Sequence, residues 1–227
     1  MAKKIVIYGN GQFAGLLYQL MSADHAFDVA AFTADRQYLK GTMLHGLPLV
    51  EFDTVETRYP PADFDMLLAI GVTRMRDRER MFEKAKAKGY YLPNYIGKRA
   101  ITYPNLVMGE NNIVFDGTCL ELNGQLGDNN MIMANCYVGH DFRIGSHNYL
   151  AAGCAIGGTS RIGSLCYIGI GTTTIQKITI ADEVLVGAGS LLVRDAKPCC
   201  RYFGVPARKT GEHSETGIVF THGGGGL

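Results

Sequence analysis

The sequence predicts two successive folds in one chain: an α/β domain with a small parallel sheet, and then a parallel β-helix. Two observations predict this order. Up to about residue 98, short β-rich runs alternate with amphipathic helical patterns. From Met108 to Leu192, every sixth residue is aliphatic or Met, with the exception of Thr174, and no insertion interrupts the series.

The composition is that of a folded chain without a strong electrostatic preference. Apolar residues make up 47% and charged residues 19%, and 22 Lys and Arg face 21 Asp and Glu. This balance argues against nucleic acid and anionic membranes as partners. No apolar run approaches the ~20 residues of a membrane span, and the one near the start is too short for a signal peptide. We therefore expect a cytoplasmic protein without membrane insertion.

The first domain is expected over residues 1–98. A helix should follow the first strand, with Leu16, Leu17, Leu20 and Met21 on one face, and a second helix is predicted over residues 74–88. The strands are predicted at residues 4–8, 29–33, 65–71 and 90–96. This alternation implies a small parallel sheet covered by helices, a Rossmann-like arrangement.

A glycine-rich turn follows the first predicted strand. Residues 9–14, Gly-Asn-Gly-Gln-Phe-Ala, match the pattern G-x-G-x-x-A, and an acidic residue, Asp35, follows near the expected distance. Taken alone, this pattern favours NAD binding. The unit ends near residue 95, however, which is about half of a dinucleotide-binding fold. A nucleotide-sugar site and a purely structural turn both remain open.

The six-residue period defines the second domain. No α-helix repeats every six residues, whereas a short strand followed by a tight turn does, and three such hexads close one triangular coil. Fifteen hexads therefore predict five coils, with the aliphatic residue inside and a small residue filling the corner beside it. Cys136, Cys154 and Cys166 occupy that small position and are expected to pack inside. No C-x-x-C pair occurs, so no metal site is expected.

The repeat ends after Leu192. Residues 197–208 are expected to form a capping turn that completes a domain over residues 99–208. The remaining residues, 209–227, are mostly polar and end in a run of four glycines, Gly223 to Gly226. We expect a tail that is mobile or docked on a partner.

His140 is the candidate catalytic residue. It lies two places after the inward Val138 and is followed by Asp141, so its side chain should project outward. Gly158 lies three hexads further, which is one coil along the axis, and its bare backbone leaves a slot beside the imidazole. A base near its working pH and an N–H donor for an oxyanion suit acyl transfer. A surface histidine in a turn is the alternative.

The hexads end in Gly204–Val205–Pro206–Ala207–Arg208, and the chain starts with a Tyr8–Gly9–Asn10–Gly11 unit. This combination resembles the left-handed β-helix (hexapeptide-repeat) acyltransferases. The resemblance is strongest to the two-domain branch that N-acetylates nucleotide-linked amino sugars, as in bacillosamine and perosamine synthesis, and covers residues 4–208. Sialic-acid O-acetyltransferases share this plan. The left hand of the β-helix rests on the resemblance alone, because parallel crossovers are usually right-handed.

The resemblance also implies roles for particular residues. His140 would be the general base, oriented by Asp141, in a direct transfer from acetyl-CoA without an acyl-enzyme. The chain would form a homotrimer with CoA between subunits. The implied CoA contacts are Tyr149, Gly158, Ile170 and Ala188, and the implied contacts to the nucleotide sugar are Gly11, Gln12, Phe13, Asp35 and Thr73.

Three functions remain open on the sequence. The favoured one is an acetyl-CoA-dependent N-acetyltransferase that acts on a nucleotide-linked amino sugar, in the synthesis of lipopolysaccharide, O-antigen or another glycan. The second is a sugar O-acyltransferase, or an N-acyltransferase that uses a longer acyl-CoA. The third is a non-catalytic β-helix scaffold or a cofactor-binding regulator.

Overall fold

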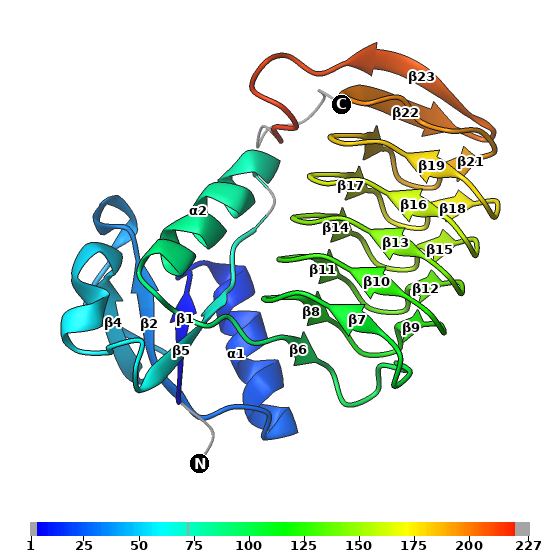
Figure 1. The fold of residues 1–227 in the computed structure, drawn as a ribbon. Coiled ribbons are helices and arrows are strands. Elements are labelled where there is room, and N and C mark those ends of the chain that lie inside the picture. Colours follow the sequence, from blue (N-terminus) through cyan, green and yellow to red (C-terminus); the bar gives the residue numbers. More distant parts are fainter. Residues whose placement is uncertain (1–3, 72, 221–227) are drawn as a thin grey trace.

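The structure is a computed structural model that describes residues 4–71 and 73–220. A small α/β domain lies beside a triangular prism of stacked coils (Figure 1). Both predicted folds, a parallel sheet and a parallel β-helix, are therefore confirmed. Within the described residues, no helix is long and apolar enough to cross a membrane.

The first domain is built on one five-stranded sheet in the order β3-β4-β2-β1-β5. All neighbours pair in parallel except β3 and β4. Its elements are β1 (Lys4–Tyr8), α1 (Gln12–Asp24), β2 (Val29–Ala34), η1 (Arg36–Tyr38), β3 (Met43–Leu44), β4 (Leu47–Glu51), η2 (Phe52–Thr57), β5 (Phe64–Leu68) and α2 (Met75–Ala87).

Strand β1, between β2 and β5, is buried on both faces, and the turn after it depends on Gly9. Ile5, Val6, Ile7 and Tyr8 are each at most 1% exposed. Gly9 has φ +143°, and a Cβ at this position would lie 2.3 Å from the carbonyl oxygen of Ala69 after β5. Only glycine closes the turn this tightly against β5.

Three walls of short parallel strands form the prism, and each strand pairs with the strand one coil further along the same wall. The first wall contains β7 (Val107–Met108), β10 (Gln125–Leu126), β13 (Arg143–Ile144), β16 (Arg161–Ile162) and β19 (Thr179–Ile180). The second contains β8 (Ile113–Val114), β11 (Met131–Ile132), β14 (Tyr149–Leu150), β17 (Tyr167–Ile168) and β20 (Leu185–Val186). The third contains β9 (Cys119–Leu120), β12 (Tyr137–Val138), β15 (Ala155–Ile156), β18 (Thr173–Thr174) and β21 (Leu191–Leu192).

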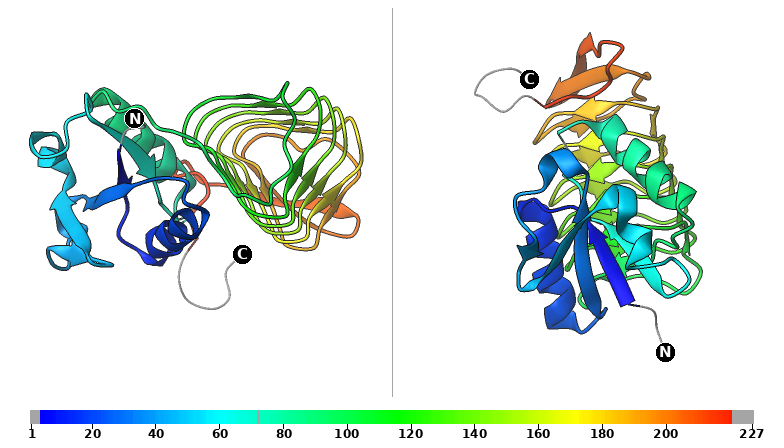
Figure 2. Two further views of the ribbon diagram at one scale, coloured as in Figure 1. Left: turned by 90° about the horizontal axis from the view of Figure 1, so that it is seen from below. Right: turned by 90° about the vertical axis from the view of Figure 1, so that its left-hand side faces the viewer.

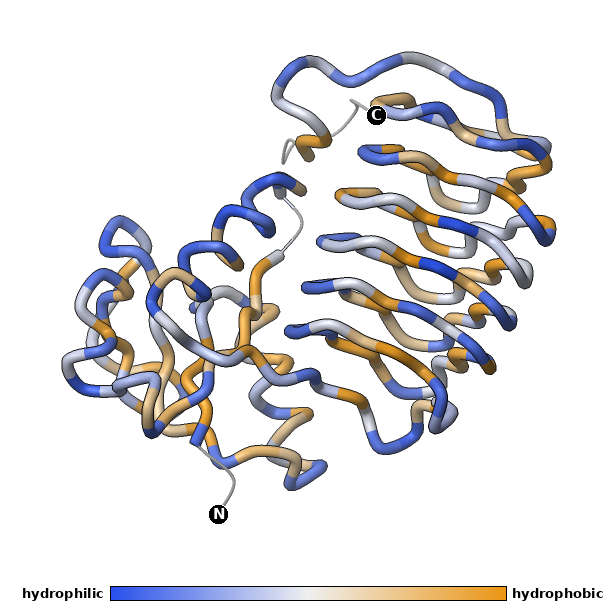
Figure 3. Tube along the Cα trace, viewed as in Figure 1, coloured by the Kyte–Doolittle hydropathy of each residue, from blue (hydrophilic) through white to orange (hydrophobic). Residues whose placement is uncertain are grey.

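The interior of the prism follows the predicted pattern. The second residue of each strand is buried in all but β7, whose Met108 at the open end is half-buried, and hydrophobic positions recur along every coil (Figure 3). Cys136, Cys154 and Cys166 are buried at the inner corners, as expected. The same corner position also holds an asparagine ladder that the sequence analysis missed. Asn130 accepts from the backbone N–H of Asn148 at 3.0 Å, and its Nδ2 donates to the carbonyl of Gly145 at 2.9 Å.

The β-helix begins earlier than the sequence analysis expected. The predicted strand over residues 90–96 is not part of the first sheet. Only β6 (Tyr95–Ile96) forms, and it pairs with β8, with Ile96 opposite Val114. Ile96 lies one coil before Val114 and therefore occupies an inward position. Thr102 interrupts the aliphatic series between Ile96 and Met108, which hid this first coil.

The C-terminal residues also differ from the expectation. In place of a capping turn, β22 (Cys200–Gly204) continues the second wall and pairs antiparallel with β23 (Ala207–Glu212). The prediction of a mobile or partner-docked tail is wrong for residues 209–220, because residues after β23 dock on their own chain. Ile218 is 1% exposed and accepts from the N–H of Met75 at 3.1 Å. The four terminal glycines lie outside the described residues.

One corner of the prism docks the first domain (Figure 2). Between the first and second walls, five residues, one from each successive coil, adopt positive φ, from 53° to 64°. Asn111 accepts from the backbone N–H of Leu68 at 2.8 Å, and Glu183 binds Arg76 through two hydrogen bonds of 2.8 and 3.2 Å. We call these five residues the docking ladder: Asn111, Asn129, His147, Leu165 and Glu183.

The centre of the docking ladder holds a buried arginine without a carboxylate partner in the described part of the chain. Arg78 is 2% exposed and donates to the carbonyls of Ile70 and Asn129, both at 2.9 Å. Asn129 Nδ2 lies 3.0 Å from His147 Nδ1, which accepts from it in the neutral imidazole. Burial lowers the pKa of Arg78 to about 10 and, together with the nearby Arg78, lowers the pKa of His147 to about 4.

The low pKa of His147 makes docking sensitive to acid. Between pH 6.5 and 4 the unfolded chain binds a proton at this residue and the folded chain does not. This contribution to stability is therefore complete above pH 6.5 and falls by about 3 kcal/mol as the pH drops to 4. We expect His147→Gln to lose less unfolding free energy than the wild type between pH 7.5 and 5.0, measured by urea denaturation. Equal losses in both proteins would contradict the burial of a neutral His147.

Candidate active site

His140 and Asp141 lie at the corner between the third and first walls. His140 Nδ1 is 2.7 Å from Asp141 Oδ2, and the backbone N–H of His140 donates to Glu121 Oε2 at 2.9 Å. Asn123 Nδ2 donates to Asp141 Oδ1 at 2.9 Å. Asp141 has φ +58°, a left-handed conformation that Asp and Asn tolerate better than most residues. The turn therefore fixes the imidazole through both its backbone and its carboxylate neighbour.

The charge on Asp141 determines which nitrogen of His140 carries the proton. The hydrogen bond with His140, followed by that with Asn123, lowers the pKa of Asp141 below its usual value. The ionised carboxylate accepts the Nδ1 proton, which leaves the lone pair of the neutral imidazole on Nε2. His140 is thus prepared to accept a proton at Nε2.

Nε2 faces the bare backbone of the next coil. A Cβ at Gly158 would lie 3.0 Å from His140 Nε2. The backbone N–H of Gly158 donates to no acceptor within the described residues. A proton acceptor therefore lies beside a backbone N–H without an acceptor in the described residues, and acyl transfer uses groups of these two kinds.

Asn123 and Glu121 support this site and were missed by the sequence analysis. Asn123 lies one coil before Asp141, and Asn105 lies one coil earlier still and donates to Asn123 at 2.5 Å. The signal was present, because the spacing of one coil joins Asn105, Asn123 and Asp141 into one ladder. This spacing could not be recognised as part of the site before the corner that holds the candidate base was known.

The four residues implied for CoA do not meet within one chain. Gly158 lies beside His140, whereas Ile170 and Ala188 lie on adjacent coils at the corner between the second and third walls. Ile170 is 62% exposed. Tyr149 lies on the second wall, half-buried and stacked on Tyr167 with ring centroids 5.2 Å apart. The third wall separates Gly158 from Ile170 and Ala188.

The five residues implied for the nucleotide sugar all follow the carboxyl ends of parallel strands. Gly11, Gln12 and Phe13 follow β1, Asp35 follows β2 and Thr73 follows β5. β1 lies between β2 and β5, so the strand order reverses there, which is where ligands bind in open α/β sheets.

The surroundings of Gly11, Phe13 and Asp35 differ from one another. A Cβ at Gly11, which has φ −85°, would meet no atom within 4 Å, so the fold itself does not require glycine there. The Phe13 ring lies 6.2 Å from that of Phe115 in the β-helix. Asp35 accepts from the Tyr8 hydroxyl at 2.7 Å and from Lys84 Nζ at 3.3 Å, and it lines a surface hollow with Arg36.

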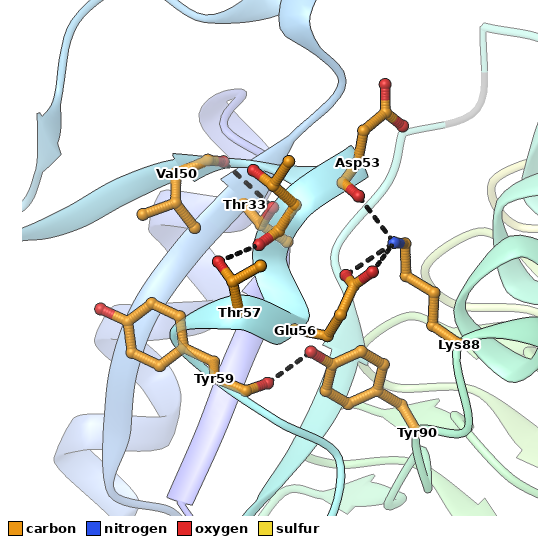
Figure 4. Close-up of polar contacts among 9 residues, drawn as sticks. Thr33, Val50, Asp53, Glu56, Thr57, Tyr59, Lys88 and Tyr90 are labelled. Carbon is orange, nitrogen blue, oxygen red and sulfur yellow. Dashed lines mark hydrogen bonds and ion pairs between the residues drawn. The ribbon is translucent and has the colours of Figure 1, made fainter.

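In a second polar cluster of the first domain, the side chains bond to one another and to nearby backbone carbonyls (Figure 4). Lys88 Nζ donates to both carboxylate oxygens of Glu56, at 2.7 and 2.6 Å, and to the carbonyl of Asp53. Tyr90 donates to the carbonyl of Tyr59. These bonds anchor η2 and the end of α2, so this cluster is structural.

Comparisons with known proteins bear on this site. Residues 123–158, which include His140 and Gly158, match the family model described as bacterial transferase hexapeptide (six repeats). The chain is 28% identical to the perosamine N-acetyltransferase of Caulobacter crescentus, solved with CoA and GDP-perosamine; the match covers 93% of this chain and 99% of that one, with a TM-score of 0.83. This chain is an acyltransferase with a left-handed β-helix, and it is similar to the hexapeptide-repeat transferases.

Two more distant structures support the fold of this acyltransferase. The acetyltransferase domain of PglB from Neisseria gonorrhoeae is 24% identical over 92% of this chain and all of that one, with a TM-score of 0.81. WeeI from Acinetobacter baumannii is 21% identical over 92% of this chain and all of that one, with a TM-score of 0.78. A search of the curated proteins finds no match.

The glycine turn of residues 9–14 and His140 lie on opposite sides of the prism. The first domain covers the second wall and the docking ladder (Figure 2). His140 lies at the corner between the third and first walls, which is the corner opposite the second wall in a triangular prism. A single chain therefore does not bring the glycine turn of residues 9–14 to His140.

Asp141→Asn tests the orientation of His140. An amide cannot accept the Nδ1 proton as a carboxylate does and does not stabilise an imidazolium, so we expect kcat to fall about 10-fold or more. The KM for acetyl-CoA should change little. The matched control is Asp182→Asn, an exposed corner carboxylate that accepts from the N–H of Ser164 at 2.7 Å and has no histidine partner within the described residues. Equal kcat in both variants would contradict a role for Asp141.

Proposed function

We propose that this protein is an acetyl-CoA-dependent N-acetyltransferase that acts on the amino group of a nucleotide-linked amino sugar. The observation that carries the proposal is His140 Nε2 facing the bare Gly158 backbone, with Asp141 at Nδ1. It is supported by the relative that was solved with CoA and GDP-perosamine and aligns over 93% of the chain. Acetyl-CoA and the sugar nucleotide are thus the proposed ligands.

The proposed reaction is direct transfer. The sugar amine attacks the thioester carbonyl while His140 Nε2 takes the amine proton, and Asp141 stabilises the imidazolium. The N–H of Gly158 donates to the oxyanion of the tetrahedral intermediate, which collapses and expels CoA as the thiolate. Cys166 is a poor nucleophile for an acyl-enzyme, since burial raises its pKa to about 12.

The opposite placement of the two half-sites makes a second chain part of the proposal. We place the nucleotide sugar at the glycine turn of one chain, with its amine at His140 of a neighbouring chain. CoA would lie between Gly158 of one chain and Ile170 and Ala188 of another, and Tyr149 lies apart from this path. The assembly is a homotrimer, with three times the chain mass of 24.7 kDa, or about 74 kDa.

A substrate panel tests the reaction. We expect CoA release from acetyl-CoA, followed with a thiol reagent, to depend on an amino-sugar nucleotide among UDP-, GDP- and dTDP-linked candidates. The matching hydroxy-sugar nucleotides should be inactive, because they lack the amine that attacks the thioester in the proposed reaction. Turnover only with hydroxy sugars or only with longer acyl-CoA would favour the second function of the sequence analysis. Tight binding of NADH without binding of any nucleotide sugar would reject the assignment of the first domain.

Two variants together test the shared site. His140→Ala should lower kcat by ~10²–10⁴, the usual contribution of a positioned base, and leave CoA binding nearly unchanged. Gly11→Val adds a side chain where the chain itself leaves open space, so the protein should fold and lose affinity for the nucleotide sugar, with an unchanged KM for acetyl-CoA.

Mixed assemblies then separate one-chain from two-chain sites. If each site combines two chains, co-expressed His140→Ala and Gly11→Val chains should recover activity at about one quarter of the interfaces, from random mixing. The control is the two purified variants combined without subunit exchange, which should stay inactive. Absence of any recovery in mixed trimers, confirmed as such by light scattering, would show that each chain holds a complete site.

A further inference from the structure

A cavity of about 360 Å³ lies between the β22–β23 hairpin and the segment after it. The polar part of its lining comes from Arg201, Glu212, His213, Ser214 and Thr216. The apolar part includes Phe203 and Phe220. The volume is at the lower end of the range for small-molecule sites, and the mixture of apolar surface with a few polar groups is typical of them.

Two side-chain nitrogens at this cavity lack hydrogen-bond partners in the part of the chain that the structure describes: Arg201 Nε is a donor, and His213 Nε2 is a donor in the tautomer that carries its proton there. Arg201 Nε and His213 Nε2 are both buried and have no hydrogen-bond partner within the described residues. An unsatisfied buried polar group costs about 1–3 kcal/mol, so two at one cavity require an explanation. An acceptor inside the cavity is the simplest explanation that accounts for both.

The surrounding carboxylates do not supply that acceptor. Glu212 lines the cavity but pairs with Lys209, and Glu183, whose charge acts on His213, is bound by Arg76. Within the described part of the chain, Arg201 has no ion-pair partner. The cavity therefore presents one uncompensated positive charge.

The guanidinium is also held in a defined place. Arg201 lies opposite Gly211 across the hairpin, and a Cβ at Gly211 would lie 2.7 Å from Arg201 Nη2. The absence of a side chain at Gly211 makes room for the guanidinium against β23. The backbone N–H of His213 donates to the carbonyl of Cys199 at 2.8 Å, which fixes the second donor residue.

We propose that this cavity binds a small organic anion. Its carboxylate or phosphate group accepts hydrogen bonds from Arg201 and His213, and its apolar part packs against Phe203 and Phe220. The site is separate from the proposed acyl-transfer site, because it lies over the second wall and not at the corner of His140. The segment after β23, which lines this cavity, also contacts the loop after β5: the N–H of Phe220 donates to the carbonyl of Thr73 at 2.8 Å.

Calorimetry on the full chain in phosphate-free buffer tests this site. The probes are inorganic phosphate, phenyl phosphate, benzoate and the neutral benzyl alcohol. We expect at least one aromatic anion to bind with a Kd below about 1 mM, more tightly than inorganic phosphate, and we expect no binding of benzyl alcohol. The tighter of phenyl phosphate and benzoate identifies the preferred anionic group. Binding of neither, or equal binding of benzyl alcohol, would overturn the proposal.

Arg201→Gln locates the binding. It should weaken the aromatic anion about 10-fold or more, because it removes a charge-assisted hydrogen bond. The matched control is Arg208→Gln, an exposed arginine on the same hairpin, which should bind like the wild type. Without ligand, Arg201→Gln should melt at or above the wild-type temperature, since it removes an uncompensated charge, and the anion should raise Tm only in the wild type. A marked loss of stability without ligand, or unchanged binding, would overturn the proposal.

Discussion

The stacking of coils, with each residue directly beside its equivalent in the next coil, is the constraint on which the rest of the structure depends. The coils approach so closely that a Cβ at Gly139 would lie 2.7 Å from the backbone nitrogen of Gly158. Glycine at such corners lets the backbones hydrogen-bond along the axis. Every corner position consequently forms a ladder of equivalent residues along the axis. Some ladders pack the interior, one docks the first domain, and one holds the proposed catalytic residues.

The docking ladder determines where the first domain lies, and this placement has a functional consequence. Arg78 links the carbonyl of Ile70, at the end of β5, to Asn129 on the prism. The edge of the sheet that carries the glycine turn is thereby fixed relative to the second wall. Since His140 lies at the opposite corner, the geometry that stabilises the chain also separates the two proposed half-sites. The proposed reaction therefore requires at least two chains in one assembly.

The sequence predicted what depends on periodicity, and missed what depends on contacts between periodic elements. The hexads defined the prism and its inward residues, and the spacing of His140 and Gly158 placed them side by side. The left hand of the coil came from family resemblance and not from the period. The docking ladder was missed because Asn111 and Asn129 have the residue type of any left-handed corner, and only the folded chain shows which corner faces α2. Ile218 was missed because the short apolar run of residues 218–220 stands alone in a polar segment and has no period.

Two histidines at neighbouring corners of the prism, His140 and His147, show how the corner determines chemistry. His147 is covered by the first domain, its Nδ1 accepts from Asn129, and burial holds its pKa near 4, so it stays neutral and structural. His140 is open to solvent, and its Nδ1 lies 2.7 Å from the carboxylate of Asp141, which orients the ring. In the proposed reaction the base accepts the amine proton, and the solvent-exposed imidazole at the His140 corner is the one that a substrate can reach.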